Sequence, residues 1–167
     1  KVGRYSKSSR KESRIKIKKK IIFKKLLSNS EISNLATLLS SRIEINRILY
    51  YNNVYKNLLN KPGVIMEFGV EWGSTLSLLI KLRSVYEPYN YSRKIIGFDT
   101  FGKFPSAGFS KDTKLRKKFV EQSGNQSIST NQLEKILKQK KIGKNVELVK
   151  GDITKTIPNY LQKHPRL

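Results

Sequence analysis

The stretch KPGVIMEFGVEWGST, residues 61–75, decides the fold of this chain. Its Pro-Gly pair stops the helical pattern before it, and the apolar run 64–69 that follows is typical of a strand buried on both faces. Gly69 permits a tight turn after this run, and Gly73 lets a helix start close beside the strand. The stretch therefore predicts a strand, a glycine turn and a helix over residues 74–85.

Two more strand patterns follow along the chain, at residues 94–99 and 146–150. A helix capped by Asn131 and ended near Gly143 is expected between them, whereas residues 102–130 are rich in Gly, Ser, Lys and Asn and show no clear period. Strands that alternate with helices form parallel βαβ units. The sequence therefore predicts an α/β fold with a doubly wound parallel sheet.

The part of the chain before the first strand is predicted to hold an arm and two helices. Residues 1–14 carry many charges and few apolar side chains, which is typical of a solvated arm, and residues 15–27 predict a helix. A second helix is expected to begin at Ser30, which can cap it, and to continue to the Pro-Gly pair. The predicted organisation is a basic N-terminal arm, residues 1–29, followed by a truncated Rossmann-like domain, residues 30–167.

The composition excludes several classes of protein. The 167 residues contain no cysteine, so a disulfide framework and a cysteine-ligated zinc site are excluded. No run approaches the roughly 18 to 20 apolar residues of a membrane span, and the start lacks the pattern of a secretory signal. We therefore expect a soluble protein that acts in the cytoplasm and has no membrane partner.

The net charge of +23 is concentrated at the start of the chain. Residues 1–25 hold 12 Lys or Arg and a single acid, Glu12, which gives +11; the other 142 residues hold 23 basic and 11 acidic side chains, which gives +12. A bias toward Lys, Ile and Asn, as AT-rich codons produce, explains the charge of the body of the chain. The basic arm keeps a nucleic-acid partner open as an alternative.

An acidic residue stands at the end of each predicted strand: Glu67, Asp99 and Asp152. Ligands of open parallel sheets bind outside the carboxyl ends of the strands, and the carboxylate of Asp99 could accept hydrogen bonds from a ribose diol. Each residue by itself also has a structural interpretation, as a turn or helix-capping residue. Three carboxylates in the same place relative to their strands favour a ligand site.

Four motifs resemble those of class I S-adenosylmethionine-dependent methyltransferases, in the macrocin O-methyltransferase-like (sugar O-methyltransferase) group. They are VIMEFGVEWG at 64–73, EPYN at 87–90 with Arg93, IGFDTF at 96–101 running to Phe104-Pro105, and VKGD at 149–152. The resemblance covers about residues 48–167, and Gly-Phe-Asp-Thr-Phe is its most specific part.

The resemblance implies S-adenosyl-L-methionine as the cofactor. It places the methionine end near Glu67, Gly69 and Gly73, the ribose hydroxyls on Asp99 and the adenine near Asp152. The full set that it assigns to cofactor binding is Glu67, Phe68, Gly69, Val70, Gly73, Ser74, Asp99, Thr100, Phe101, Asp152 and Ile153.

Two departures from the family pattern matter. Glu71 stands where many class I enzymes carry a second glycine, so a wider turn is expected. The chain also ends at Leu167, before the family's next strand and its Asp-rich segment that binds a divalent metal. The resemblance therefore implies an N-terminal fragment that is itself inactive and holds only the half of a Rossmann-like sheet with strand order 3-2-1. It also implies a divalent metal, with Mg as the first candidate, whose ligands lie outside this chain. No catalytic residue is named, and a homo-oligomer of the longer protein is an open expectation.

The leading hypothesis is an S-adenosylmethionine-dependent O-methyltransferase that acts on a hydroxyl of a sugar or of another small polyhydroxylated acceptor. An RNA methyltransferase and a non-catalytic protein that binds nucleic acid or anions on a Rossmann-like scaffold are the alternatives. A dehydrogenase is disfavoured, because the third glycine of the dinucleotide fingerprint is missing and Glu67 would crowd a pyrophosphate.

Overall fold

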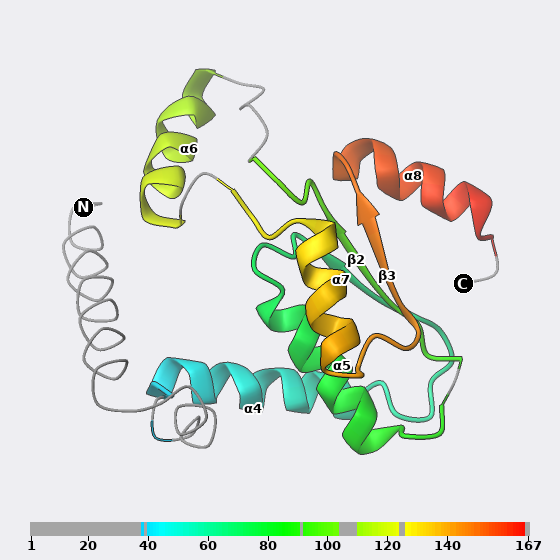
Figure 1. Ribbon diagram of the computed structural model, residues 1–167. Helices are drawn as coiled ribbons and strands as arrows, with labels where there is room; N and C mark the ends of the chain where they lie inside the picture. Colours follow the sequence, from blue (N-terminus) through cyan, green and yellow to red (C-terminus); the bar gives the residue numbers. More distant parts are fainter. Residues whose placement is uncertain (1–37, 39, 91, 104–109, 124–125, 166–167) are drawn as a thin grey trace. The chain divides into compact units, whose positions relative to one another are not determined.

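A computed structural model of the chain describes residues 38, 40–90, 92–103, 110–123 and 126–165 (Figure 1). The predicted arm and the predicted helix over 15–27 lie outside these residues. The chain divides into two compact units, Lys1–Arg47 and Ile48–Leu167, and the sheet belongs to the second. The predicted boundary after residue 29 stays a prediction. None of the described helices is long and apolar enough to span a membrane.

Helices and strands alternate along the chain, as the sequence predicts. The described elements are α4 (Arg42–Lys56), β1 (Ile65–Phe68), α5 (Ser74–Tyr86), β2 (Ile95–Asp99), α6 (Ser110–Ser123), α7 (Thr130–Gln139), β3 (Val146–Lys150) and α8 (Ile153–Lys163).

The three strands form one parallel sheet in the order β1-β2-β3. Ile65 of β1 pairs with Ile95 of β2, and Ile95 pairs with Val146 of β3. This confirms the predicted 3-2-1 half of a Rossmann-like sheet. Because all three strands run in the same direction, the residues that follow them come together at one edge of the sheet.

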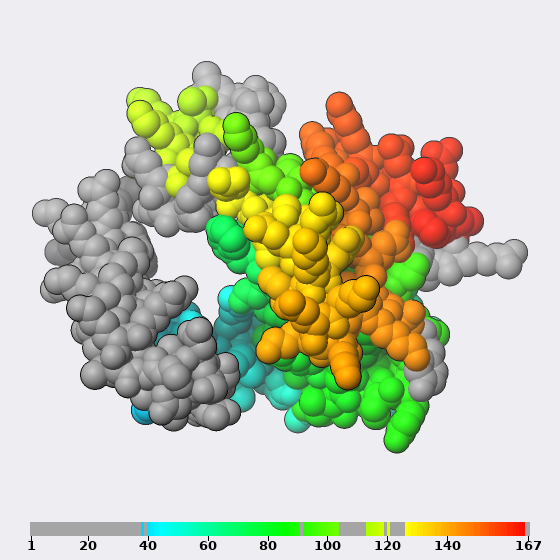
Figure 2. Space-filling model, in the orientation of Figure 1, coloured from blue at the N-terminus to red at the C-terminus, as the bar shows by residue number. Residues whose placement is uncertain are grey.

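Helices cover both faces of the sheet (Figure 1). On one face Ile65 and Ile95 pack in a core with α5 and α7, to which Leu76 and Leu133 contribute. On the opposite face a smaller cluster joins the sheet to α8 and is centred on Phe98. Figure 2 shows the side chains of α7 lying over the first face, between α5 and β3. Burial of β2 on both faces explains why its sequence reads as a continuous apolar run.

Gly97, in the middle of β2, leaves room for the turn that follows β1. A Cβ atom at this position would lie 2.8 Å from Cγ2 of Val70 and 3.4 Å from side-chain atoms of Leu76 and Leu148. Val70 belongs to the glycine turn after β1 and is 3% exposed. The absent side chain of Gly97 thus allows Val70 to anchor that turn on the sheet.

Gly97→Ala is expected to lower the free energy of unfolding by about 1–3 kcal/mol, because the added methyl group overpacks a filled core. Urea denaturation followed by circular dichroism measures the change. Gly102→Ala is the matched control, since a Cβ at that glycine would meet only a backbone oxygen at 3.8 Å. Equal stabilities of the two variants would contradict the prediction.

One predicted helix start, Asn131, is wrong, and the helix predicted from Ser30 is not continuous; Ser30 itself lies outside the described residues. Both α4 and α7 begin at a capping box. The unbroken helix expected from Ser30 is interrupted at Ser41, whose hydroxyl accepts from the Glu44 N–H while the Glu44 carboxylate accepts from the Ser41 N–H. The cap of α7 is Ser129 with Gln132, and not Asn131. In each case the Ser-x-x-Glu/Gln pattern was present in the sequence.

Two helices were not predicted. Residues 102–130 show no clear period in the sequence, yet they contain α6, which has few apolar residues to reveal one. The helix α8 begins after Asp152 and contains Pro158, a residue that ordinarily argues against a helix interior. Because Pro158 has no backbone N–H, α8 lacks the hydrogen bond that another residue would donate from this position.

Two buried arginines hold together the end of the sheet opposite the strand carboxyl ends. The Arg93 guanidinium is paired with Glu87 at 2.9 Å and also donates to the backbone oxygens of Leu58, Lys61 and Gly63, at 2.8–3.1 Å. Arg93 thereby joins the loop after α5 to the chain between α4 and β1.

Arg83, on α5, donates to the backbone oxygens of Arg93, Lys144 and Asn145. These contacts tie α5 to the starts of β2 and β3. The two arginines therefore fix how the three strands begin, and with this the register that brings the strand ends together.

Candidate functional site

The turn between β1 and α5 contains three residues with positive φ. They are Gly69 at 89°, Glu71 at 53° and Gly73 at 76°. The wider turn expected for Glu71 is not found: Glu71 itself adopts the left-handed conformation that a glycine would adopt more easily. The turn is closed by a hydrogen bond of 2.8 Å from the Gly73 N–H to the Val70 oxygen. The turn is therefore tight despite the departure in sequence.

The two glycines of this turn have different roles. A Cβ at Gly73 would lie 3.1 Å from Cδ1 of Leu133, so this glycine lets α7 pack closely against the start of α5. A Cβ at Gly69 would meet no atom within 4 Å. Gly69 thus leaves open space directly above the carboxyl end of β1, as close approach of a ligand requires.

Asp99, the last residue of β2, is the centre of the site's hydrogen bonds. Its Oδ2 accepts from the Glu71 N–H at 2.9 Å, and its Oδ1 accepts from the Phe101 N–H at 2.8 Å. The hydroxyls of Ser127 and Thr100 lie 3.1 and 3.2 Å from the same Oδ1. Asp99 therefore connects the glycine turn, its own turn and the segment before α7.

The two oxygens of this carboxylate are used unequally. A carboxylate oxygen offers about two lone-pair sites. Oδ1 of Asp99 is saturated by its donors, whereas Oδ2 accepts only the Glu71 N–H among the hydrogen bonds of the described residues. Oδ2 can still accept a hydroxyl proton from a ligand.

The segment 126–128 completes this arrangement, and sequence reasoning missed it. The Ser127 N–H donates to the Gly102 oxygen at 2.8 Å, and the Ile128 N–H donates to the Glu71 oxygen at 3.0 Å. The segment lies in the stretch without a period, so no pattern in the sequence indicated that it contacts both turns.

The other predicted residues of the first two strands divide by burial. Glu67 is half-buried and pairs in register with Gly97 of β2. Asp99 lies two residues after Gly97 on the same strand, so Glu67 and Asp99 lie on the same face of the sheet. Val70 and Phe101 are core residues, so their side chains support the site from below and do not contact a ligand directly. Phe68, Ser74 and Thr100 are exposed or half-exposed at the same edge.

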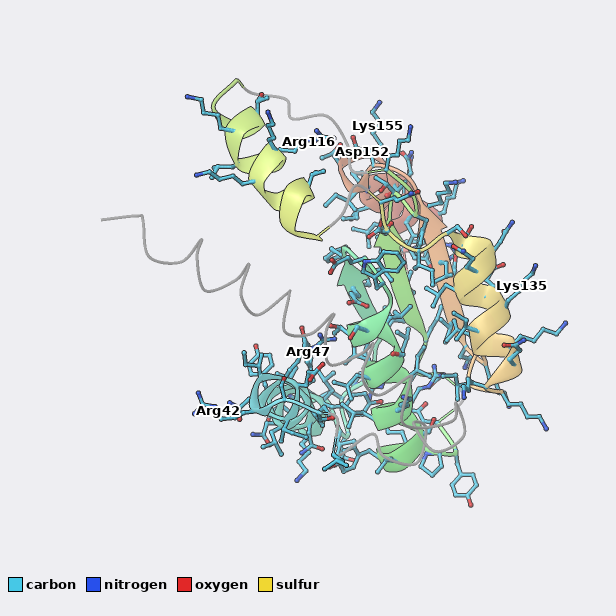
Figure 3. The ribbon with its side chains drawn as sticks, turned by 60° about the vertical axis from the view of Figure 1, so that its left-hand side comes forward. Arg42, Arg47, Arg116, Lys135, Asp152 and Lys155 are labelled. Carbon is cyan, nitrogen blue, oxygen red and sulfur yellow. The ribbon has the colours of Figure 1, made fainter. Side chains whose placement is uncertain are left out.

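Asp152 follows β3 and caps α8. Its Oδ1 accepts from the Thr154 N–H at 2.9 Å and from the Thr154 hydroxyl at 2.7 Å, and these bonds lower the pKa of this carboxyl. Figure 3 shows Asp152 with Lys155 at the amino-terminal end of α8. The carboxylate thus has a structural role, and its predicted place near the adenine, with the exposed Ile153, stays a prediction.

The residues present fit the nucleoside and methionine parts of S-adenosylmethionine. The open space at Gly69 allows close approach to the backbone, and Oδ2 of Asp99 is placed to accept from a ribose hydroxyl. The described residues do not include a metal site, because no group of three His, Asp or Glu side chains among them could hold an ion.

The strand order and the site at the strand ends define a Rossmann-like methyltransferase fold. One solved structure similar to the chain is the crystal structure of CalS11, described as calicheamicin methyltransferase. The TM-score is 0.65 and the sequence identity 25%, over 99% of this chain and 65% of that one.

A second is the apo structure of CalS11, described as a TDP-rhamnose 3′-O-methyltransferase and an enzyme in calicheamicin biosynthesis. Here the TM-score is 0.56 and the identity 33%, over 84% of this chain and 55% of that one. The chain thus spans less than two thirds of the length of either structure. No protein-family model and no curated protein sequence matches it.

The fold and these similarities support the resemblance drawn from the motifs. Both similar structures are sugar O-methyltransferases or are described as methyltransferases, and the chain is similar to this class. CalS11 is one solved protein that this chain resembles, and the similarity extends over 99% of this chain.

Proposed function

We propose that the protein is an S-adenosylmethionine-dependent O-methyltransferase that acts on a hydroxyl of a sugar or of another small polyhydroxylated acceptor. The observation that carries the proposal is the edge of the sheet where Oδ2 of Asp99 keeps capacity to accept, beside the open space of Gly69. A module that only binds phosphate gains nothing from a carboxylate at this place, because like charges repel.

Methyl transfer depends mainly on the alignment of the methyl donor with the acceptor hydroxyl. S-adenosylmethionine supplies, when bound, an electrophilic methyl group on a sulfonium. The chain's own part is to bind and orient: the turn after β1 receives the methionine end, and Asp99 fixes the ribose. Positioning of reacting groups accounts for a large share of such a rate.

A sugar linked to a nucleotide is the acceptor class that we favour, because one similar structure is described as a TDP-rhamnose methyltransferase. The divalent metal, the homo-oligomer and the cytoplasmic location remain predictions of the sequence.

Calorimetric titration with S-adenosylmethionine tests the proposal, with NAD titrated in parallel. We expect a dissociation constant in the micromolar range for the first and no measurable heat for the second, since the site has a ribose-binding carboxylate but no complete dinucleotide fingerprint. A folded protein that binds NAD, or that binds neither compound, would contradict the proposal.

An RNA acceptor is the second candidate, favoured by a cluster of exposed lysines on α7 and after it: Lys135, Lys138, Lys140, Lys141 and Lys144. Figure 3 shows Lys135 pointing away from the sheet. Binding to RNA would weaken steeply as the salt concentration rises, because neutralised phosphates release counterions. Methyl transfer to RNA, and not to a nucleotide-linked sugar, would favour this candidate.

A further inference from the structure

Ser127 is a buried polar residue to which neither the motifs nor the fold assign a role. It is 8% exposed and precedes α7 by three residues. Its hydroxyl lies 3.1 Å from Oδ1 of Asp99, and it accepts from the Gly102 N–H at 3.0 Å. The side chain thus stands between the carboxylate of β2 and the backbone of the turn that follows it.

The single proton of this hydroxyl has two acceptors within reach. These are Oδ1 of Asp99 at 3.1 Å and the Gly102 oxygen at 3.3 Å. The Gly102 oxygen already accepts from the Ser127 N–H at 2.8 Å, and a carboxylate is the stronger acceptor. The proton of Ser127 therefore goes to Asp99.

The hydroxyl of Thr100 is a weaker partner for the same carboxylate. It is 3.2 Å from Oδ1 of Asp99 and also 3.2 Å from the Lys103 oxygen, so its proton is shared between two equal distances. Ser127 is thus the side chain that holds Oδ1 in place, while the Phe101 N–H holds it from the backbone.

We infer that Ser127 is a positioning residue for cofactor binding: by fixing Oδ1 of Asp99 it keeps Oδ2 turned toward the ribose hydroxyls. The inference rests on the proposed function. It also assigns a role to the segment 126–128. The Ile128 N–H donates to the Glu71 oxygen, and the Glu71 N–H in turn donates to Oδ2 of Asp99. One short segment thereby orients both oxygens of the carboxylate.

A purely structural role of Ser127 makes a different prediction. If the serine only supported the loop, its loss would weaken every ligand of the site by the same factor. If it orients Asp99, its loss would weaken only those ligands that offer ribose hydroxyls. The 2′,3′-dideoxy analogue of S-adenosylhomocysteine separates the two roles, because it lacks the groups that Asp99 would hold.

The test compares S-adenosylhomocysteine with this analogue by calorimetry in wild type, Ser127→Ala and Ser127→Thr. We expect Ser127→Ala to bind S-adenosylhomocysteine about tenfold more weakly and the analogue with unchanged affinity. Ser127→Thr keeps the hydroxyl and should recover most of the affinity. If the alanine variant fails to fold, Ser127→Cys, which has a similar size and a poor donor, replaces it.

Ser129→Ala is the matched control. Ser129 lies two residues away and caps α7, so its loss should lower the stability of the protein without changing either affinity. An equal loss of affinity for both ligands in Ser127→Ala, or no loss for either, would overturn the inference. Such a result leaves the proposed function intact, provided that the wild type binds S-adenosylhomocysteine. Absence of binding in the folded wild type would instead overturn the proposed function and the inference with it.

Discussion

Arg93→Ala is expected to lower the free energy of unfolding by about 3–5 kcal/mol, because it leaves the largely buried carboxylate of Glu87 without its cationic partner. Arg93 is 4% exposed and donates to both oxygens of Glu87, at 2.9 and 3.0 Å. Three backbone oxygens before β1 lose their donor in the same variant. The effect exceeds that of an ordinary surface ion pair because the Arg93 and Glu87 side chains are only 4% and 10% exposed.

Chemical denaturation measures this loss, with Arg42→Ala as the matched control. Arg42 is exposed at the start of α4, so its replacement should change stability by no more than about 0.5 kcal/mol. Arg93→Lys should recover only part of the loss, since a single ammonium cannot reach the carboxylate and three carbonyls together. A cost below 1 kcal/mol for Arg93→Ala would contradict the structural role.

The pH dependence of stability is a second measurement of the same contact. Hydrogen bonds from Arg93, opposed by burial and aided by Tyr55 and Asn90, lower the pKa of Glu87 from 4.5 to about 2. Because the pKa is lower in the folded state, this contribution is present above pH 4.5 and is lost as the pH falls toward 2. Arg93→Ala should lack most of this acid-dependent loss between pH 4.5 and pH 2.

Asp99→Ala is expected to weaken S-adenosylmethionine binding by about 100-fold or more. The variant removes the charged acceptor that we assign to the ribose, and hydrogen bonds to charged groups contribute about 1.5–3 kcal/mol each. It also removes the acceptor of the Glu71 and Phe101 N–H groups, so stability should fall by about 1–3 kcal/mol. Asp99 thus joins ligand binding to the shape of both turns.

Calorimetry on variants that are shown to be folded checks the affinity. Asp99→Asn keeps the size of the side chain but presents an NH₂ group either to the Glu71 N–H or to the donors at Oδ1, so it should also bind weakly. Glu134→Ala removes an exposed carboxylate of α7 and serves as the charge control. Near-wild-type affinity in a folded Asp99→Ala variant would remove Asp99 from the site.

The sequence predicted the strands well, because each is a short apolar run bounded by turn residues. Residues 146–150 were predicted and observed with the same bounds, and 94–99 differs from β2 by one residue. Burial on both faces makes such runs conspicuous. The alternation with helices then leaves few topologies, and the parallel order is the one observed.

The helices were predicted less well, because their ends depend on local hydrogen bonds. Ser41 and Ser129 both head capping boxes, yet competing signals at Ser30 and Asn131 were preferred. A few tenths of a kcal/mol separate such alternatives, and tertiary contacts then decide between them.

The sequence by itself determined the parallel sheet and the acid at the end of β2, since both depend on runs of adjacent residues. Only the tertiary structure decided what surrounds Asp99. Ser127 lies 28 residues further along the chain and Glu71 lies 28 residues before it, and no local pattern links them. The hydrogen bonds of Asp99 form only when β1, β2 and the segment before α7 come together, so the orientation of the carboxylate is a property of the folded chain.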